Sequence, residues 1–207
     1  MRILNELGTI ELFGKVVVSD PCYDRDVWCM VDDLAVKPGR YKTWSVLSDE
    51  SSWGMRVAAL VLIHEDFTED DLKNWKSIEC SIGVDSGQCG IFDDSIYPQK
   101  KEPQKFESFY KECCDITLSD KSAGIMKNGK GVVSSSGYGD GTYELFAVIR
   151  KGEYVALTLN YNLTKMRNIM RLLVERQQNN EMEGVVKNAQ KMVREGLFGM
   201  PNKLRAG

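Results

Sequence analysis

The chain of 207 residues is long enough for one substantial core, and its 43% hydrophobic and 28% charged residues are typical of a globular protein that folds in water. The roughly 20 consecutive apolar residues of a membrane helix are absent, and the start, MRILNELGTIELFGK, lacks the apolar stretch of a secretory signal. The net charge of −3 hides an asymmetry: residues 165–207 hold nine Lys and Arg against four Asp and Glu, and residues 1–164 hold 18 against 26. We expect a cytoplasmic protein with an acidic body, a basic tail and no membrane contact.

Cysteine and histidine restrict the chemistry. The six cysteines form no CxxC pair, so neither a zinc site nor a disulfide framework is indicated. His64 is the one histidine, which excludes a histidine-rich metal site and leaves any histidine-dependent nucleophile to this residue. At the end of an apolar segment, His64 is expected to be hydrogen-bonded locally.

The first third of the chain predicts strands. TIEL (9–12) and KVVVSD (15–20) stand on either side of Phe13-Gly14 and predict a hairpin. Residues 38–47 follow a Pro-Gly turn signal and predict a strand. Residues 54–64 are almost continuously apolar, which predicts a central strand buried on both faces.

The middle third predicts two short helices among strands. Residues 68–76 predict a helix with Thr68 as its N-cap. Residues 81–94 predict a strand, a tight loop and a second strand. Residues 103–114 predict a helix whose apolar stripe lies against the sheet; the stripe consists of Phe106, Phe109, Tyr110, Cys113 and Cys114.

Three strands at 132–138, 142–150 and 153–161 are expected to form an antiparallel meander, with a hairpin turn at the Gly-Asp-Gly of residues 139–141. From Thr164 the apolar spacing becomes helical. One stripe runs from Met166 to Leu173 and a second from Val185 to Leu197, separated by QQNNEMEG, which predicts a helical hairpin. The expected fold is mainly β with α additions: an antiparallel β-sandwich or open barrel over residues 1–162, followed by a basic helical extension over residues 163–207.

Several segments together resemble, in order and rough spacing, the bacterial family catalogued as domain of unknown function 4241. They are SDP (19–21), PGRY (38–41), RVAAL (56–60), GVDSGQCGIFDD (83–94) and SSSGYGDGTYELF (134–146). The resemblance covers about residues 9–161 and not the helical tail. It implies a β-rich fold with recurrent acidic and glycine positions, and the added helices suggest a phage or another mobile element.

Acidic residues at predicted strand ends form the first candidate site. If the sheet brings Asp20, Asp85 and Asp140 to one rim, their carboxylates could bind Mg²⁺ or Ca²⁺ and support phosphodiester hydrolysis. Asp85 and Gln88 stand on either side of a Gly turn and could instead line a small polar-ligand pocket. Alternatively, both residues could have a purely structural role: Asp85 could accept hydrogen bonds from the amides of its own loop, and Asp140 could be a residue that the tight turn requires.

The basic tail and the aromatic residues form the second set of candidates. The cations Arg167, Arg171, Lys187, Lys191 and Arg194 could meet nucleic acid or an acidic protein, or form a solvated helix face. The four tryptophans, Trp28, Trp44, Trp53 and Trp75, either fill the core or stack bases. We therefore expect a non-enzymatic binding or inhibitory protein that acts on a host protein or nucleoprotein, or self-associates through its C-terminal helices. The alternative is an Asp-based, metal-dependent hydrolase of phosphate esters.

Overall fold

The computed structural model describes the backbone of residues 1–100 and 102–194; from residue 180 on, it describes the side chains of Lys187, Gln190 and Lys191 only. The chain divides into two compact units, Met1–Ile169 and Met170–Gly207. All of the strands among these residues belong to the first unit. No helix in the described part of the chain is long and apolar enough to cross a membrane.

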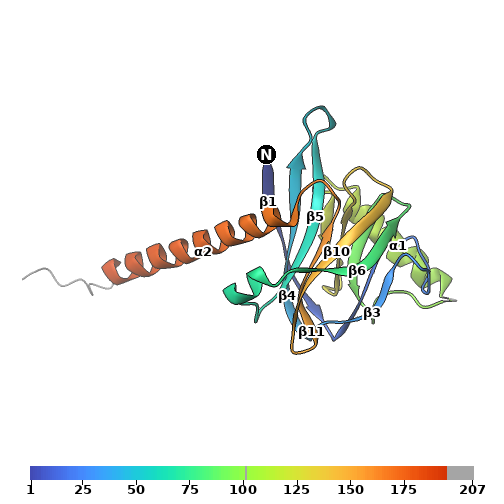
Figure 1. The fold of residues 1–207 in the computed structure, drawn as a ribbon, viewed down its shortest axis with the longest axis horizontal. Coiled ribbons are helices and arrows are strands. Elements are labelled where there is room, and N and C mark those ends of the chain that lie inside the picture. Colours follow the sequence, from blue (N-terminus) through green and yellow to red (C-terminus); the bar gives the residue numbers. More distant parts are fainter. Residues whose placement is uncertain (101, 195–207) are drawn as a thin grey trace, which may run out of the picture. The chain divides into compact units, whose positions relative to one another are not determined.

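Two antiparallel sheets form the first unit (Figure 1). The larger sheet has six strands in the order β1 (Arg2–Leu12), β4 (Gly39–Asp49), β5 (Met55–His64), β11 (Glu153–Asn160), β10 (Gly141–Arg150) and β6 (Lys76–Val84). The smaller sheet has five strands in the order β3 (Val31–Ala35), β2 (Lys15–Ser19), β7 (Gln88–Asp93), β9 (Gly131–Ser135) and β8 (Ala123–Ile125). This architecture confirms the expectation of a sandwich-like, mainly β fold with helical additions.

The core lies between the two sheets. Buried side chains from the larger sheet, such as Leu60 and Leu157, belong to the same cluster as Val16 and Ile91 from the smaller sheet. Burial of such side chains is the main favourable term in folding, at about 1.5–3 kcal/mol for each large apolar side chain. The predicted central position of residues 54–64 is confirmed, because β5 lies between β4 and β11.

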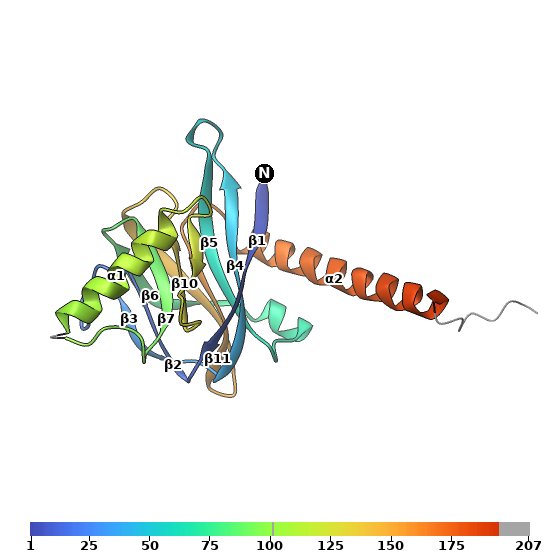
Figure 2. The ribbon, with the colours of Figure 1, turned by 180° about the vertical axis from the view of Figure 1, so that it is seen from behind.

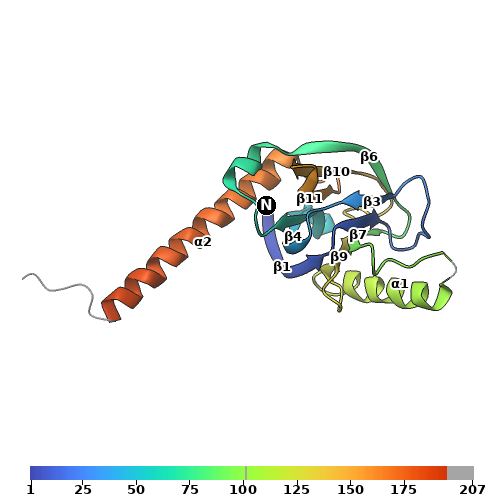
Figure 3. The same ribbon diagram turned by 90° about the horizontal axis from the view of Figure 1, so that it is seen from below.

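Helix α1 (Pro103–Thr117) covers the outer face of the smaller sheet (Figures 2 and 3). Phe109 and Cys113 from its predicted stripe are buried there with Phe92 and Val133. The smaller sheet is therefore covered on both faces, which explains why Val17 and its neighbours in β2 are buried on alternate sides.

Two predicted hairpins are wrong. TIEL falls in β1 of the larger sheet and KVVVSD in β2 of the smaller sheet, and the chain crosses between the sheets at Phe13-Gly14. The backbone N–H of Phe13 donates to the buried carboxylate of Asp93 at this crossing, over 2.6 Å. The Gly-Asp-Gly loop likewise joins β9 of the smaller sheet to β10 of the larger one. A period of two reveals which residues are buried but not which sheet buries them.

Short-range signals fare better. β10 and β11 pair as a hairpin, and both residues of the turn, Lys151 and Gly152, have positive φ, at 54° and 88°. Thr68 begins a capping box with Asp71, as predicted, but the helix is a short 3₁₀ segment, η2 (Glu69–Lys73), because β6 begins at Lys76.

The C-terminal hairpin is also wrong over the described residues, where α2 (Met166–Arg194) is one continuous helix. QQNNEMEG continues the helix because its Gln, Glu and Met favour helix and its single glycine costs only about 1 kcal/mol. Ile169 and Leu173 of the first stripe are buried. The side chains of the second stripe, from Val185 to Leu197, lie outside the described residues.

Candidate functional site

Three segments that are distant in sequence meet at one end of the sandwich. They are the loop after β2 that begins with Asp20, the turn of residues 85–87 between β6 and β7, and the loop of residues 136–140 between β9 and β10. Asp20 bonds to the turn of residues 85–87 through its carboxylate. The backbone N–H of Ser136 donates to the carbonyl of Gly87 over 3.0 Å. The structure therefore brings Asp20 and the turn that contains Asp85 together at this end of the sandwich.

The carboxylate of Asp20 is fully buried and accepts four hydrogen bonds. Oδ1 accepts from the N–H of Cys22 and the hydroxyl of Ser86, at 2.9 and 2.5 Å. Oδ2 accepts from the N–H groups of Asp85 and Ser86, at 2.8 and 2.7 Å. Because a carboxylate offers about four lone-pair positions, the protein itself uses the full acceptor capacity of Asp20. Asp20 fixes the turn of residues 85–87.

Asp85 and Gln88 point to different neighbours. The exposed carboxylate of Asp85 accepts a hydrogen bond from the hydroxyl of Tyr23 over 2.6 Å. The buried amide of Gln88 accepts from the hydroxyl of Thr117 and donates to the sulfur of Cys114, so that it joins β7 to α1. These two residues therefore do not line one polar pocket.

Asp140 is exposed, and its carboxylate has no hydrogen bond or ion pair among the described residues. The loop around it is shaped by other groups. The hydroxyls of Ser136 and Tyr143 both donate to the carbonyl of Gly139, at 2.8 and 2.6 Å. Gly137 and Gly139 take positive φ, at 59° and 110°. Among the described residues, no group of three or more His, Cys, Asp and Glu could hold a metal ion. The Mg²⁺ or Ca²⁺ site at Asp20, Asp85 and Asp140 stays a prediction.

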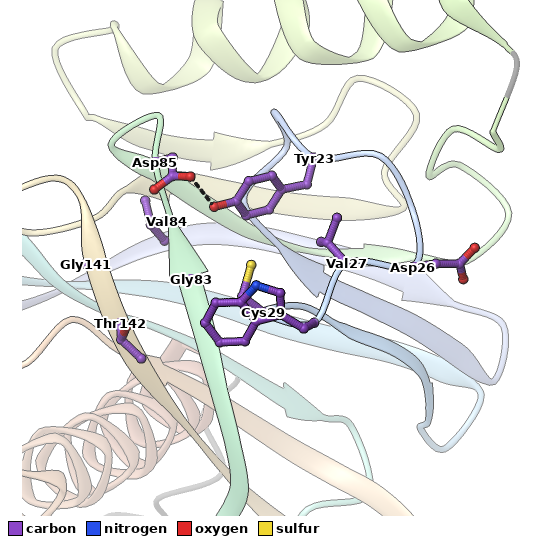
Figure 4. A pocket seen from close by; sticks show the side chains of 10 residues that line it. Tyr23, Asp26, Val27, Cys29, Gly83, Val84, Asp85, Gly141 and Thr142 are labelled. Carbon is purple, nitrogen blue, oxygen red and sulfur yellow. Dashed lines mark hydrogen bonds between the residues drawn. The ribbon is translucent and has the colours of Figure 1, made fainter.

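An open cleft of about 660 Å³ lies beside this junction (Figure 4). The loop after β2 forms one wall, and the ends of β6 and β10 that meet at the junction form the other. The lining includes Tyr23, Trp28, Cys29, Asp85 and Thr142. The loop is fixed to β6 because the N–H of Gly83 donates to the carbonyl of Cys29 over 2.8 Å. Gly83 permits this approach, since a Cβ there would lie 2.8 Å from the Cβ of Cys29.

Ionisable groups near the junction are held in their protonated forms. Burial, followed by the hydrogen bond to Asp85, raises the pKa of Tyr23 well above its usual range. Burial and the neighbouring carboxylate of Asp20 raise the pKa of Cys22 to about 12. Burial also raises the pKa of Cys113. A thiol with so high a pKa is a poor nucleophile near neutral pH, because the thiolate is the reactive form.

His64 is bonded locally, as predicted. Its Nδ1 accepts from the backbone N–H of Asp66 over 3.0 Å, which assigns the proton to Nε2 and makes Nε2 the donor to the carbonyl of Pro38 over 3.2 Å. The ring is buried and packs edge-on against Tyr41. Both ring nitrogens therefore serve the backbone.

A second surface was not predicted from the sequence. Trp53, Met55 and Tyr138 are exposed large side chains at the tip of the β4–β5 hairpin and in the adjacent loop of residues 136–140, and we call them the aromatic patch. The Trp53 and Tyr138 rings are edge-on with centroids 6.1 Å apart. The hydroxyl of Tyr138 donates to Glu50 over 2.7 Å. The sequence did contain a pattern that could have indicated the aromatic patch. Each of two short Ser/Gly-rich segments, SSWG and SGYGDG, holds one large aromatic residue.

The cations of the tail are distributed around α2. Arg167, Arg171, Lys187 and Lys191 are exposed, and Arg171 pairs with Glu175 over 3.7 Å. The side chain of Arg194 lies outside the described residues. In a continuous helix, Lys187 lies about 200° around the axis and about 30 Å along it from Arg167. The expectation that these cations share one or adjacent surfaces therefore depended on the hairpin.

The comparisons with known proteins add no relative to these observations. The resemblance of residues 9–161 to domain of unknown function 4241 stays a prediction. No protein-family model, no curated protein and no solved structure matches this chain.

Proposed function

We propose that the protein is a non-enzymatic binding protein that docks onto a host protein or nucleoprotein through the aromatic patch. The observation that carries this proposal is the pairing of two exposed aromatic side chains from distant segments, Trp53 and Tyr138, with 66% and 56% of their surfaces accessible. Trp and Tyr are the residue types that most often dominate the binding energy of protein interfaces.

The aromatic patch is held in place before any partner arrives. Glu50 accepts from Tyr138 through one carboxylate oxygen and from the hydroxyl of Ser48 through the other, at 2.7 and 2.6 Å. The carboxylate of Asp49 accepts from the N–H of Ser51 and fixes the start of the short 3₁₀ segment η1 (Ser51–Trp53). Because these bonds already restrict the Tyr138 side chain and the backbone that leads to Trp53, binding of a partner would cost less conformational entropy.

Several of the groups that a catalytic function could use are engaged in the fold. The Asp20 carboxylate has no acceptor capacity left, and both nitrogens of His64 bond to backbone. The thiols of Cys22 and Cys113 are held protonated. These observations support binding over the hydrolase alternative. Inhibition of the partner, an origin in a phage and self-association through α2 stay predictions.

Affinity capture with matched variants tests the proposal. The full chain, Trp53→Ser, Tyr138→Ser and Ile149→Ser would each be immobilised and exposed to a lysate of the source cells. Ile149 is the control because it is an exposed apolar residue at the opposite end of β10 from Gly141. We expect a partner retained by the full chain and Ile149→Ser and lost from both patch variants, with the purified pair reproducing this order.

Equal retention by all four proteins would contradict the role of the aromatic patch. Turnover of a phosphodiester by the purified chain, abolished in Asp20→Asn while folding is preserved, would favour the hydrolase instead.

A further inference from the structure

We propose that the cleft beside Asp85 binds an organic cation, with a guanidinium or ammonium group bonded to the Asp85 carboxylate and placed against the Trp28 and Tyr23 rings. This site is separate from the aromatic patch, since the two share no residue. Its volume of about 660 Å³ lies within the range of small-molecule sites, about 300–1,000 Å³.

The charge of the lining selects a cation. Asp26 and Asp85 line the cleft, and among the described residues that line it none is Lys, Arg or His. The carboxylate of Asp26 lies 2.8 Å from the ammonium of Lys100, which is outside the lining, so Asp85 is the carboxylate that is available to a cation. An anion would meet an unpaired carboxylate here and no positive partner.

Asp85 is oriented for a ligand. Its Oδ2 accepts from the hydroxyl of Tyr23, and its Oδ1 makes no hydrogen bond to another described residue. Figure 4 shows the two side chains pointing toward each other, Tyr23 from the loop after β2 and Asp85 from the turn after β6. A carboxylate that is fixed through one oxygen can offer the other to an N–H donor without first losing rotational freedom.

Trp28 supplies the second contact. Its side chain is 87% exposed, more than that of Trp53 or Tyr138. Its backbone, in contrast, is restricted by hydrogen bonds on either side. The N–H of Met30 donates to the carbonyl of Val27 and closes the turn, and Cys29 is bonded to Gly83. The turn therefore holds the backbone of Trp28 in the cleft lining and leaves the indole exposed to solvent. Indole and phenol faces attract cations, more strongly when the cation is desolvated.

The same chemistry has two sources: a free small cation, or an Arg or Lys side chain of a peptide. The test uses agmatine for the first source and a blocked Gly-Arg-Gly tripeptide for the second, with citrate as the anion. The full chain is labelled with ¹⁵N at the indole nitrogens, and the Trp28 signal is identified by its loss in Trp28→Phe.

We expect the Trp28 indole signal to shift saturably with agmatine or the tripeptide and not with citrate, and the shift to weaken as salt is added. Tighter binding of agmatine would assign the cleft to a free cation, and tighter binding of the tripeptide to a peptide side chain. Asp85→Asn should weaken binding about tenfold or more, because the charge-assisted bond is lost. Asp120→Asn, the same change at an exposed site on another loop, should leave it unaltered.

Two variants separate this site from other effects. Trp28→Ala, labelled uniformly with ¹⁵N, should weaken binding, read from the shifts of backbone amides near Asp85. This variant tests the site without altering Asp85. Trp53→Ser should leave cation binding unchanged, so that failure of the aromatic patch and failure of the cleft are told apart. Three results would each overturn the proposal. They are the absence of a saturable Trp28 shift with both cationic probes, an affinity of Asp85→Asn and Trp28→Ala equal to that of the unaltered chain, and preferential binding of citrate.

Discussion

The buried carboxylate of Asp20 accepts two hydrogen bonds from Ser86, one from its backbone N–H over 2.7 Å and one from its hydroxyl over 2.5 Å. Ser86 lies in the turn between the two sheets, and Asp20 follows a strand of the smaller sheet. One side chain thus fixes the position at which the chain passes from one sheet to the other.

Asp20→Asn should destabilise the protein strongly. An amide NH₂ would replace one acceptor oxygen and face donor groups, and buried donors without partners cost about 1–3 kcal/mol each. We expect a loss of about 2–4 kcal/mol in the free energy of unfolding, measured by urea denaturation and equal with and without Mg²⁺. Asp140→Asn, at an exposed side chain, should change it by less than about 0.5 kcal/mol. A stabilisation by Mg²⁺ that disappears in both variants would instead reveal a metal site.

Gly137→Ala should cost more than Gly129→Ala, although both glycines have left-handed φ, at 59° and 71°. Each alanine incurs the left-handed penalty of about 1–2 kcal/mol. A Cβ on Gly137 would in addition lie 3.2 Å from the Cβ of Tyr161, whereas a Cβ on Gly129 meets nothing within 4 Å. Thermal unfolding of the two variants measures the difference. Equal losses would show that the loop moves away from Tyr161.

The pKa of Glu50 should report on the aromatic patch. Hydrogen bonds from Ser48 and then Tyr138 hold this pKa below its usual value of 4.5. Because this pKa is lowered in the folded state, the bonds stabilise the folded protein fully when the pH is above the usual pKa of Glu. That stabilisation is lost as the pH falls through the pKa of the folded state. Tyr138→Phe should therefore raise the pKa of Glu50, followed by carboxyl ¹³C shifts, and Ile149→Ser should leave it unchanged. An unaltered pKa in Tyr138→Phe would mean that the bond does not persist in solution.

A chain shortened to residues 1–169 should fold with nearly the stability of the whole, because Met1–Ile169 form one compact unit. A chain that ends at residue 162 should be less stable. It lacks Ile169, which is fully buried, and the carbonyl of Thr164, which accepts from Asn160 over 3.1 Å. Circular dichroism during heating compares the two. Equal melting temperatures would place the boundary at the position expected from the sequence.

The sequence predicted strands well and their partners poorly. Continuous apolar runs identified β5, and the two closely spaced strand patterns at 142–150 and 153–161 identified the β10–β11 hairpin, because both depend on neighbours along the chain. Assignment of a strand to one sheet or the other depends on long-range pairing, which leaves no local pattern. This is why β1 and β2, and also β9 and β10, were expected to pair and do not.

The candidate site shows the same division. The sequence suggested Asp20, Asp85 and Asp140 as residues that could converge, and the structure brings Asp20 into contact with the backbone of Asp85. The sequence could not show that the turn's own amides and Ser86 use all of the acceptor capacity of Asp20. Nor could it separate the tryptophans: Trp44 is buried in the core, whereas Trp28 and Trp53 are 87% and 66% exposed. Residue type sets the average preference for burial, but the path of the backbone determines whether a particular tryptophan is buried.

The passage of the chain back and forth between the two sheets has a consequence for how the protein folds. β1 and β2 belong to different sheets, and so do β6 and β7. Neither complete sheet is therefore made of one continuous stretch of chain that could form before the other sheet. The loop-closing contacts, such as Phe13 with Asp93 and Asp20 with Asp85, join residues far apart in sequence. Chains whose native contacts are mostly non-local fold slowly, in milliseconds to seconds. Residues 1–169 should therefore assemble in one cooperative and comparatively slow step, in which both sheets appear together.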